Sequence, residues 1–497
     1  MKIRYYIFIL FGLLMANSCD LTEEPYGFYS EDNFYKSEAD AESAVSYAYD
    51  ALTYLEYSRG VFMLGDMPTD EVGPKTDEGA DAQALNNWTV DNFSNNRSLY
   101  NYFKYAYIAI NRTNGILEAI PASDIPADAQ KRYLGEAYFL RAWNYFNLVR
   151  NFGLVPVHKE LVAELGQTAA PMAQDLDELY DLIIGDCRRA IELLEVLPAL
   201  GRADEVSAQA LAAKAYIYMA SSKASSVPLY TDLALNAATL YDSAAYFSGQ
   251  VVNDQATYGF DPDLMHIYDV ESPRGPEHIF LMSMDRTGAI EGDYSKISKL
   301  FIPYISGGDI YIDNGDGTYD KSHDGWSVFQ TKETFYNTYD GADARGQVLL
   351  VDAVYDENGV ESAAFPGAIP YRFCRKYVDP QFIADKTSTR PFLIRYTDIA
   401  LTYAEAVGPT AEAYDLVNYV RNRAGLGDLP AGLSVVDFRD RIIEERSWEL
   451  AFEGNRLYDL RRINKVTEMV DEAAGITDEE AAFYPIPQLE IDLNQGL

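Results

Sequence analysis

The stretch that says most about the fold of this 497-residue chain reads Glu444-Glu445-Arg446-Ser447-Trp448-Glu449-Leu450-Ala451-Phe452-Glu453-Gly454-Asn455-Arg456, followed by Leu457-Tyr458-Asp459-Leu460-Arg461-Arg462. Its charges recur at helical spacing, which pairs Arg441 with Glu445 and Arg446 with Glu449. Such pairs on a helix surface contribute roughly a few tenths of a kcal/mol each. Although the density of charge suggests catalysis at first sight, we interpret the stretch as a structural network of ion pairs and packing contacts.

Outward from this stretch, other segments also carry apolar residues at helical spacing. They are Ala39–Tyr57, Leu99–Ile120, Ala127–Arg150, Leu176–Leu197, Ser207–Ser221, Leu233–Tyr246, Tyr396–Ala424 with a break at Gly408-Pro409, and Val435–Glu453. Small residues precede larger ones by four positions, as in Ala142 and Phe146, or Ala237 and Tyr241. That rhythm is typical of tetratricopeptide-like repeats, in which small residues let antiparallel helices approach closely.

The expected organisation is therefore mainly α-helical, with a helical scaffold over about 36–245 and 395–465. Between about 245 and 395, Gly, Pro, Asp, Ser and Tyr dominate and the periodicity fades. This stretch is far longer than a connecting loop. We expect it to be a loop-rich functional insertion packed on the scaffold.

The N-terminus predicts export. Lys2 and Arg4 precede an apolar run, Tyr5–Met15, that is too short for a permanent membrane span. Cys19 follows directly, as in a bacterial lipobox, so we expect cleavage after residue 18, lipidation of Cys19 and an acidic tether over 19–30. The alternative is an ordinary signal peptide with an incidental cysteine. Residues 19–497 are then expected to form one domain.

The charge of the chain limits its possible binding partners, and its few cysteines limit its possible disulfides. With 77 acidic and 40 basic side chains, the formal net charge is −37, which makes nucleic acid an unfavourable partner. After Cys19 only Cys187 and Cys374 remain. The sequence does not decide whether they pair, although the helical pattern around Cys187 favours a buried free thiol.

Catalytic and metal motifs are sparse. The four histidines are scattered, and the chain contains no His-x-x-x-His zinc pair, no Gly-x-Ser-x-Gly elbow and no P-loop. Because carboxylates are so abundant, the possibility that two of them act as a glycosidase pair stays open. The acidic, glycine-rich run 313–320 favours a β-hairpin turn, with a calcium site at Asp313, Asp316 and Asp320 as the alternative. We expect no cofactor.

Taken together, the motifs resemble the SusD/RagB family of outer-membrane nutrient-binding lipoproteins. The resemblance rests on Glu444–Arg462, on Gly135-Glu136-Ala137-Tyr138-Phe139-Leu140-Arg141-Ala142, on Tyr403-Ala404-Glu405-Ala406, on Asn418 to Leu426, and on Tyr484-Pro485-Ile486-Pro487. These motifs occur in the family's order and span nearly the whole chain. The gap between Ala406 and Ala413 is short for the family.

The resemblance implies about four tetratricopeptide-like helix pairs carrying a large ligand-binding insertion. It also implies a lipid-anchored protein on the cell exterior that captures a glycan or oligosaccharide and delivers it to a SusC-like TonB-dependent outer-membrane transporter, without enzymatic activity. Two alternatives stay open, namely the same fold binding peptides for uptake, and a glycoside hydrolase. The negative net charge favours a neutral glycan over sulfated or uronic polymers unless basic residues cluster locally.

Sugars pack against flat aromatic faces and bind polar side chains through their hydroxyls. In the first loop the candidates are Asp70 as a hydroxyl acceptor, with Asn87, Trp88 and Arg97. In the insertion they are Tyr304, Tyr311 and Trp326, the last in a turn that favours exposure of the ring. Each aromatic has a core position as its alternative. Trp143 and Trp448 are expected in the core, and Tyr339 to Arg345 is interpreted as structural.

Overall fold

The computed structural model describes residues 35–164, 167–196, 200–253, 257–288, 295–305, 307–494 and 496. The predicted signal peptide, Cys19 and the acidic tether lie outside these residues. Within the described chain, no helix is both long and apolar enough to cross a membrane.

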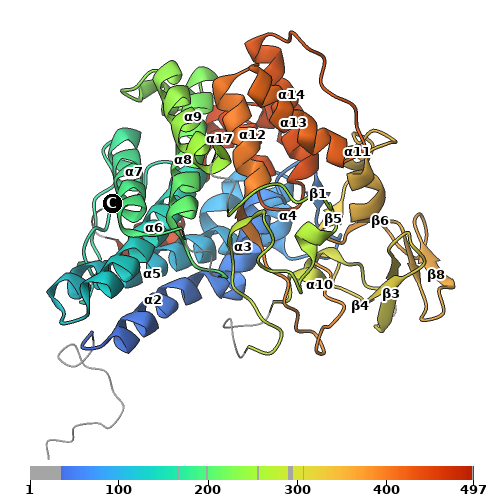
Figure 1. The fold of residues 1–497 in the computed structure, drawn as a ribbon, viewed down its shortest axis with the longest axis horizontal. Coiled ribbons are helices and arrows are strands. Elements are labelled where there is room, and N and C mark those ends of the chain that lie inside the picture. Colours follow the sequence, from blue (N-terminus) through green and yellow to red (C-terminus); the bar gives the residue numbers. More distant parts are fainter. Residues whose placement is uncertain are drawn as a thin grey trace, which may run out of the picture.

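The scaffold is a curved row of antiparallel helices in which each helix packs on the next (Figure 1). Four successive pairs make up the row, which confirms the expected fold class: α2 (Glu38–Thr53) with α5 (Arg97–Ala119), α6 (Ala127–Phe152) with α7 (Leu176–Leu193), α8 (Glu205–Ala224) with α9 (Ala237–Asn253), and α12 (Tyr396–Val407) with α13 (Ala411–Arg423). Next to the last pair lies α14 (Val435–Glu449), and α15 (Arg456–Arg462) follows it.

Local sequence sets where these helices begin and end. The Asp204 side chain caps the first turn of α8, and Ser207 completes a capping box. Gly153 ends α6 and Gly408 ends α12, each with the positive φ that glycine tolerates best. The alanines of α8 are buried except Ala224 at its end, which lets α7 and α9 approach the helix closely. Shorter helices α3 (Leu55–Gly65) and α4 (Ala80–Asn86) follow α2.

The segment between α9 and α12, on the right of Figure 1, carries short strands joined by longer loops, and we call it the strand-rich segment. A four-stranded antiparallel sheet has the order β4 (Tyr319–His323), β3 (Asp309–Asp313), β7 (Ala353–Tyr355) and β8 (Glu361–Ala364). Two-stranded pairs join β2 (His278–Leu281) to β10 (Phe392–Arg395), β6 (Leu350–Val351) to β9 (Phe373–Cys374), and β1 (Val72–Gly73) to β5 (Gln330–Thr331). The acidic run 313–320 forms the β3–β4 turn, so the predicted hairpin is confirmed.

A buried ionic network joins the strand-rich segment to α13 and α14. Arg395 reaches Glu277 at 2.8 Å, Glu449 at 3.0 Å and Glu453 at 2.9 Å. Glu449 also pairs with Arg345 and Arg423. All of these side chains are buried, and together the three arginines hold the pKa of Glu449 well below its usual range against the opposing effect of burial. Fully paired buried charges of this kind fix how elements dock, because unpairing one is costly.

This network confirms the structural interpretation of Glu444–Arg462 but corrects its pairing. Arg441 pairs with Glu444 at the surface and not with Glu445, which binds Arg345 and Arg421 instead. The partners of Arg446 are Asp398 and Asp459, not Glu449. The predicted pairs are wrong because this face of α14 is buried, so its charges meet groups from other elements before they meet each other.

Two further expectations concern the core. Cys187 and Cys374 are both buried free thiols, and burial raises the pKa of Cys374 to about 12. Trp143 is buried as expected. Trp448 is only half-buried, and its Nε1 donates a hydrogen bond to Thr338 Oγ1.

Candidate functional site

Two large exposed aromatic side chains lie on neighbouring segments of the strand-rich segment. Tyr304 is 65% exposed and Trp326 is 38% exposed. Tyr304 follows α10 (Ile297–Phe301), and Trp326 lies between β4 and β5. We call Tyr304 and Trp326, with the flanking Lys296 and Lys299, the aromatic surface.

Backbone contacts hold the two aromatic segments together. Gly325 N donates to Pro303 O at 2.9 Å, and Ser327 N donates to Ile302 O at 3.1 Å. Tyr304 N donates to Ser327 Oγ at 3.0 Å. At Gly325 a Cβ would lie 2.0 Å from the carbonyl oxygen of Ile302, so only glycine fits there. The backbone of the two segments is therefore held in one arrangement, which favours a preformed binding surface.

Basic side chains line one edge of this surface. Lys296 Nζ lies 6.0 Å and Lys299 Nζ 5.8 Å from the centroid of the Trp326 ring. Lys296 also pairs with Asp385 at 2.9 Å. Neither lysine was a sequence candidate. Their spacing on α10 gives no sign that they flank a tryptophan some thirty residues further on.

A histidine lies close to the same edge. His323 is 7% exposed, and its ring packs edge-on against Phe382 with centroids 4.5 Å apart. Neither ring nitrogen has a hydrogen-bond partner within the described residues. Burial lowers the pKa of His323, and the positive charge of Lys299 lowers it further, so the ring is neutral near pH 7.

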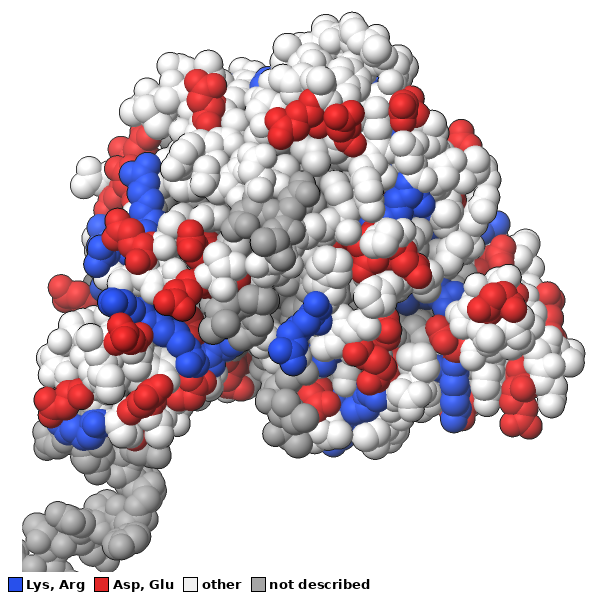
Figure 2. All heavy atoms as spheres, viewed as in Figure 1, with Lys and Arg blue, Asp and Glu red and all other residues white. Residues whose placement is uncertain are grey.

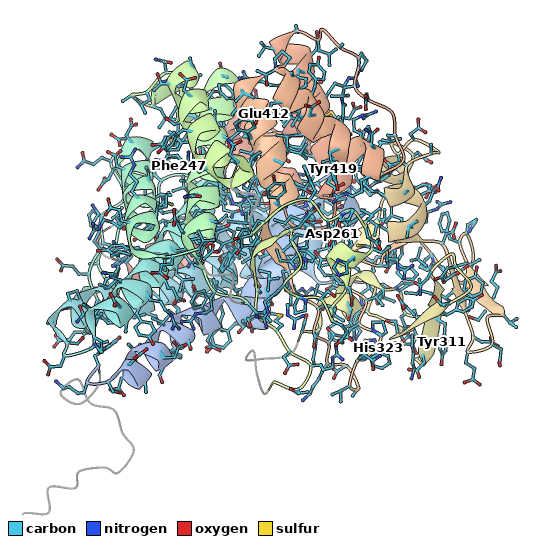
Figure 3. All side chains as sticks on the ribbon, viewed as in Figure 1. Phe247, Asp261, Tyr311, His323, Glu412 and Tyr419 are labelled. Carbon is cyan, nitrogen blue, oxygen red and sulfur yellow. The ribbon has the colours of Figure 1, made fainter. Side chains whose placement is uncertain are left out.

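Tyr311 lies on β3 beside this region. It is half-buried and faces Lys321 on β4 and Tyr355 on β7 in the strand register. Residues 309, 311 and 313 alternate with the buried Ile310 and Ile312, so Tyr311 points to the outer face of the sheet. Figure 3 shows Tyr311 and His323 in the same part of the strand-rich segment.

The first-loop candidates are placed differently. Trp88 is 3% exposed, its Nε1 donates to Pro68 O at 3.0 Å, and its ring stacks with Tyr484. Asp70 accepts two hydrogen bonds from Arg456, at 2.8 and 2.7 Å. A ring without an exposed face cannot stack on a sugar, and a carboxylate held by a guanidinium is a poor hydroxyl acceptor. Trp88 therefore belongs to the interior, whereas Asp70 is partly exposed but held by Arg456, and we carry neither into the site.

Asn87 and Arg97 are exposed, but neither contacts the aromatic surface. Asn87 Oδ1 accepts from Asn86 Nδ2 at 2.9 Å. Arg97 begins α5 and lines a cavity of about 310 Å³ together with Glu56, Arg59 and Glu78. Neither side chain has a hydrogen bond or ring contact with Tyr304, Tyr311 or Trp326 in the described structure. The structure thus groups the insertion candidates and leaves the first-loop candidates outside the group.

The calcium alternative finds little support in the geometry. Asp320 pairs with the buried Arg375 at 2.9 Å, which places a positive charge where a cation would bind. Asp313 and Asp316 cap turn amides at Gly315 and Thr318. Among the described residues, no group of three or more His, Cys, Asp or Glu is arranged to hold a metal ion.

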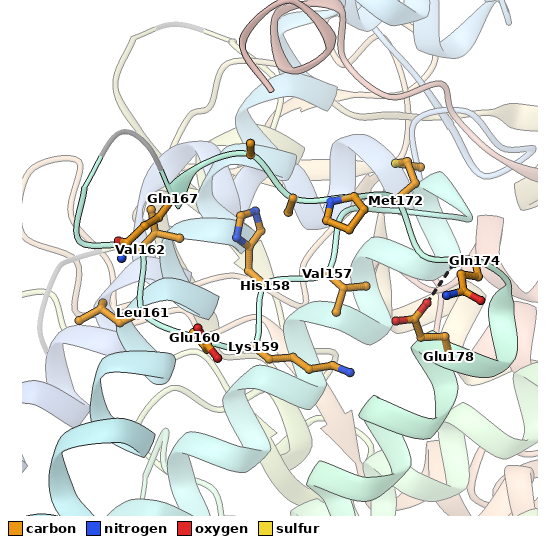
Figure 4. A pocket seen from close by; sticks show the side chains of 13 residues that line it. Val157, His158, Lys159, Glu160, Leu161, Val162, Gln167, Met172, Gln174 and Glu178 are labelled. Carbon is orange, nitrogen blue, oxygen red and sulfur yellow. Dashed lines mark hydrogen bonds between the residues drawn. The ribbon is translucent and has the colours of Figure 1, made fainter. Parts of the chain in front are cut away.

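A separate cavity of about 440 Å³ lies under the segment that connects α6 to α7 (Figure 4). Its lining includes Val157, His158, Met172 and Glu178, and Glu178 Oε2 accepts from Gln174 N at 2.9 Å. The lining contains no tyrosine, phenylalanine or tryptophan. Because it offers no aromatic face, we do not assign it to the candidate site.

Comparison with known proteins gives the family. A model described as the SusD family matches residues 326–497, and a model described as starch-binding associating with outer membrane matches residues 29–217. The SusD-like protein P38 of Formosa agariphila is 28% identical over 495 residues, which cover 95% of this chain and 93% of that protein.

Solved structures share the fold. A SusD homologue from Bacteroides thetaiotaomicron superposes with a TM-score of 0.76 at 20% identity, covering 94% of this chain and 98% of that one. A laminarin-binding SusD-like protein superposes with a TM-score of 0.75 at 24% identity, covering 93% and 98%. The chain is similar to the SusD/RagB family along most of its length and has the tetratricopeptide-like fold of the solved members, in agreement with its motifs.

Proposed function

We propose that this protein captures a glycan or oligosaccharide on the aromatic surface and does not cleave it. The observation that carries the proposal is the exposed pair Tyr304 and Trp326, held in a fixed relation by backbone hydrogen bonds. Exposed aromatic rings on a rigid backbone present the flat apolar faces on which sugar rings stack. Similarity to a family with starch-binding and laminarin-binding members supports the same class of ligand.

Tyr311 extends the proposed surface along the outer face of the sheet, and Lys321 lies opposite it. A chain of several sugars would then contact more than one aromatic side chain. Modest affinity at each contact adds up along such a chain, as it does in other multivalent systems.

The test is native electrophoresis of the purified protein through gels that contain laminarin, starch, other neutral polysaccharides or acidic polysaccharides. We expect retardation by at least one glycan and none by a protein digest. Retardation relieved only by peptides would move the proposal to the peptide alternative. Release of reducing ends on prolonged incubation would favour the glycoside hydrolase.

The proposal includes a place at the cell surface. We propose that Cys19 is lipidated, that the anchored protein faces the exterior of the outer membrane, and that it delivers its ligand to a SusC-like TonB-dependent transporter. The family model's description as associating with the outer membrane supports this location. Metabolic labelling with a fatty acid, lost in Cys19→Ala, tests the anchor, and co-purification of a transporter barrel with the native protein tests the partner.

A further inference from the structure

Lys299 is an unpaired cation at the edge of the aromatic surface. The ammonium has no carboxylate within ion-pair distance in the described structure, and its one recorded contact is the Trp326 ring, 5.8 Å from Nζ to centroid. That distance is near the outer limit for a cation–π interaction. Lys299 is half-buried, so the three N–H donors of its ammonium stay open to solvent or to a ligand.

The carboxylates around Lys299 are already engaged. Asp385 pairs with Lys296, and the hydrogen bond from Lys296 lowers the pKa of Asp385. Asp309 pairs with Lys321 at 2.7 Å, and that bond raises the pKa of Lys321. Asp324 is buried and accepts the backbone N–H groups of Ile305 and Gly307. Asp385 also feels the charge of Lys299, but none of the three carboxylates lies within ion-pair distance of its ammonium in the described structure, so that charge is only partly offset and can meet a ligand.

A second polar group without a partner lies close to this charge. His323 is more than nine-tenths buried, both of its ring nitrogens lack hydrogen bonds, and it feels the charge of Lys299. A neutral imidazole offers one N–H donor. The Lys299 ammonium and the imidazole N–H of His323, which feels its charge, both favour an acceptor-rich anion, and the buried imidazole donor would recover free energy by meeting one.

We propose that the sugar bound on Trp326 carries an anionic group, a uronate carboxylate or a sulfate ester, and that Lys299 pairs with it. The inference rests on the proposed glycan function and specifies its ligand class. It departs from the preference for a neutral glycan that the net charge suggests, because the local charge at the ring edge, and not the total charge, is what a bound sugar meets. Acidic and basic side chains are interspersed on the face in Figure 2, as local rather than global matching requires.

The test measures binding of the full protein to three classes of probe. Polygalacturonate and alginate supply carboxylates, carrageenan supplies sulfates, and laminarin is neutral. Lys299→Met is compared with Lys104→Met, a matched control, since Lys104 Nζ lies 5.5 Å from the Tyr105 ring on α5 and its replacement removes the same charge from a similar contact.

We expect Lys299→Met to weaken binding of an acidic probe about tenfold, the loss expected for a hydrogen bond to a charged group. Lys104→Met should change it less than twofold. Binding of the acidic probe should also weaken as NaCl rises from about 50 to 500 mM, because salt screens an exposed pair. Comparing the carboxylated with the sulfated probes identifies the anion.

Two results overturn the proposal. If laminarin or another neutral glycan binds through Trp326 and no acidic probe binds more tightly, the anionic assignment fails while the glycan function stands. If an acidic probe binds and Lys299→Met leaves its affinity unchanged, Lys299 is not the group that pairs with it. Failure of every probe, acidic and neutral, would instead contradict the proposed function itself.

Discussion

The network around Arg395 and the aromatic surface treat charge in opposite ways. In the network every cation is buried among carboxylates from other elements, and Arg395 alone contacts Glu277, Glu449 and Glu453. At the aromatic surface, Lys299 and His323 keep donors without partners. The difference indicates that the first region holds the fold together, whereas the second keeps polar groups available for a ligand.

The largest effect on the free energy of unfolding is expected when a buried cation of the network is removed. Arg395→Met leaves Glu277 and Glu453 short of a partner and should reduce the free energy of unfolding by about 3–5 kcal/mol. Arg441→Met removes only the exposed pair with Glu444 and should cost about 0.5 kcal/mol or less. Denaturant unfolding of the two variants measures both. Equal, small losses would mean that the network does not hold the docking of α14.

The next largest difference is expected between variants of Trp88 and Trp326. Trp88→Ala removes a buried ring and its hydrogen bond to Pro68, so the free energy of unfolding should fall by about 3–5 kcal/mol. Trp326 is 38% exposed, so Trp326→Ala removes less buried area and should cost clearly less than Trp88→Ala. Thermal unfolding measured side by side separates the two roles. A large loss in Trp326→Ala would place that ring in the core.

A change of pH should have a smaller effect on the free energy of unfolding. Lys214 and Arg446 hold the pKa of Asp398 well below its usual range against the effect of burial. A depressed folded-state pKa stabilises the protein above the unfolded value of about 4, and that contribution is lost as pH falls toward the folded value. The difference in unfolding free energy between the native chain and Asp398→Asn should therefore be largest near pH 7 and shrink below about pH 4. A difference that does not change with pH would show that Asp398 is not charged in the fold.

Sequence periodicity predicts the long helices well. Ala127–Arg150 matches α6 (Ala127–Phe152) and Leu99–Ile120 matches α5 (Arg97–Ala119), because long amphipathic segments with clear capping residues leave few alternatives. The segment Ala39–Tyr57 instead breaks at Tyr54 into α2 and α3. No glycine or proline marks that break, so it is visible only in the structure.

The site is harder to predict because exposure depends on tertiary packing. Trp88 and Trp326 both follow turn-forming residues. In the fold, Trp88 lies next to α4 and stacks on Tyr484, so it is buried, whereas Trp326 is exposed. The correct pairing of Arg446 depends on Asp398, 48 residues earlier in the chain. The position of Lys299 beside the Trp326 ring arises only in the folded chain, so the sequence alone does not identify Lys299 as a site residue.

The measurement that tests the account most directly is titration calorimetry of the native protein, Trp326→Ala and Trp88→Phe with a glycan that retards the native protein in gels. The account predicts that Trp326→Ala weakens binding at least about tenfold although the variant remains folded, whereas Trp88→Phe keeps the native affinity. Native affinity in Trp326→Ala would contradict the placement of the ligand on the aromatic surface.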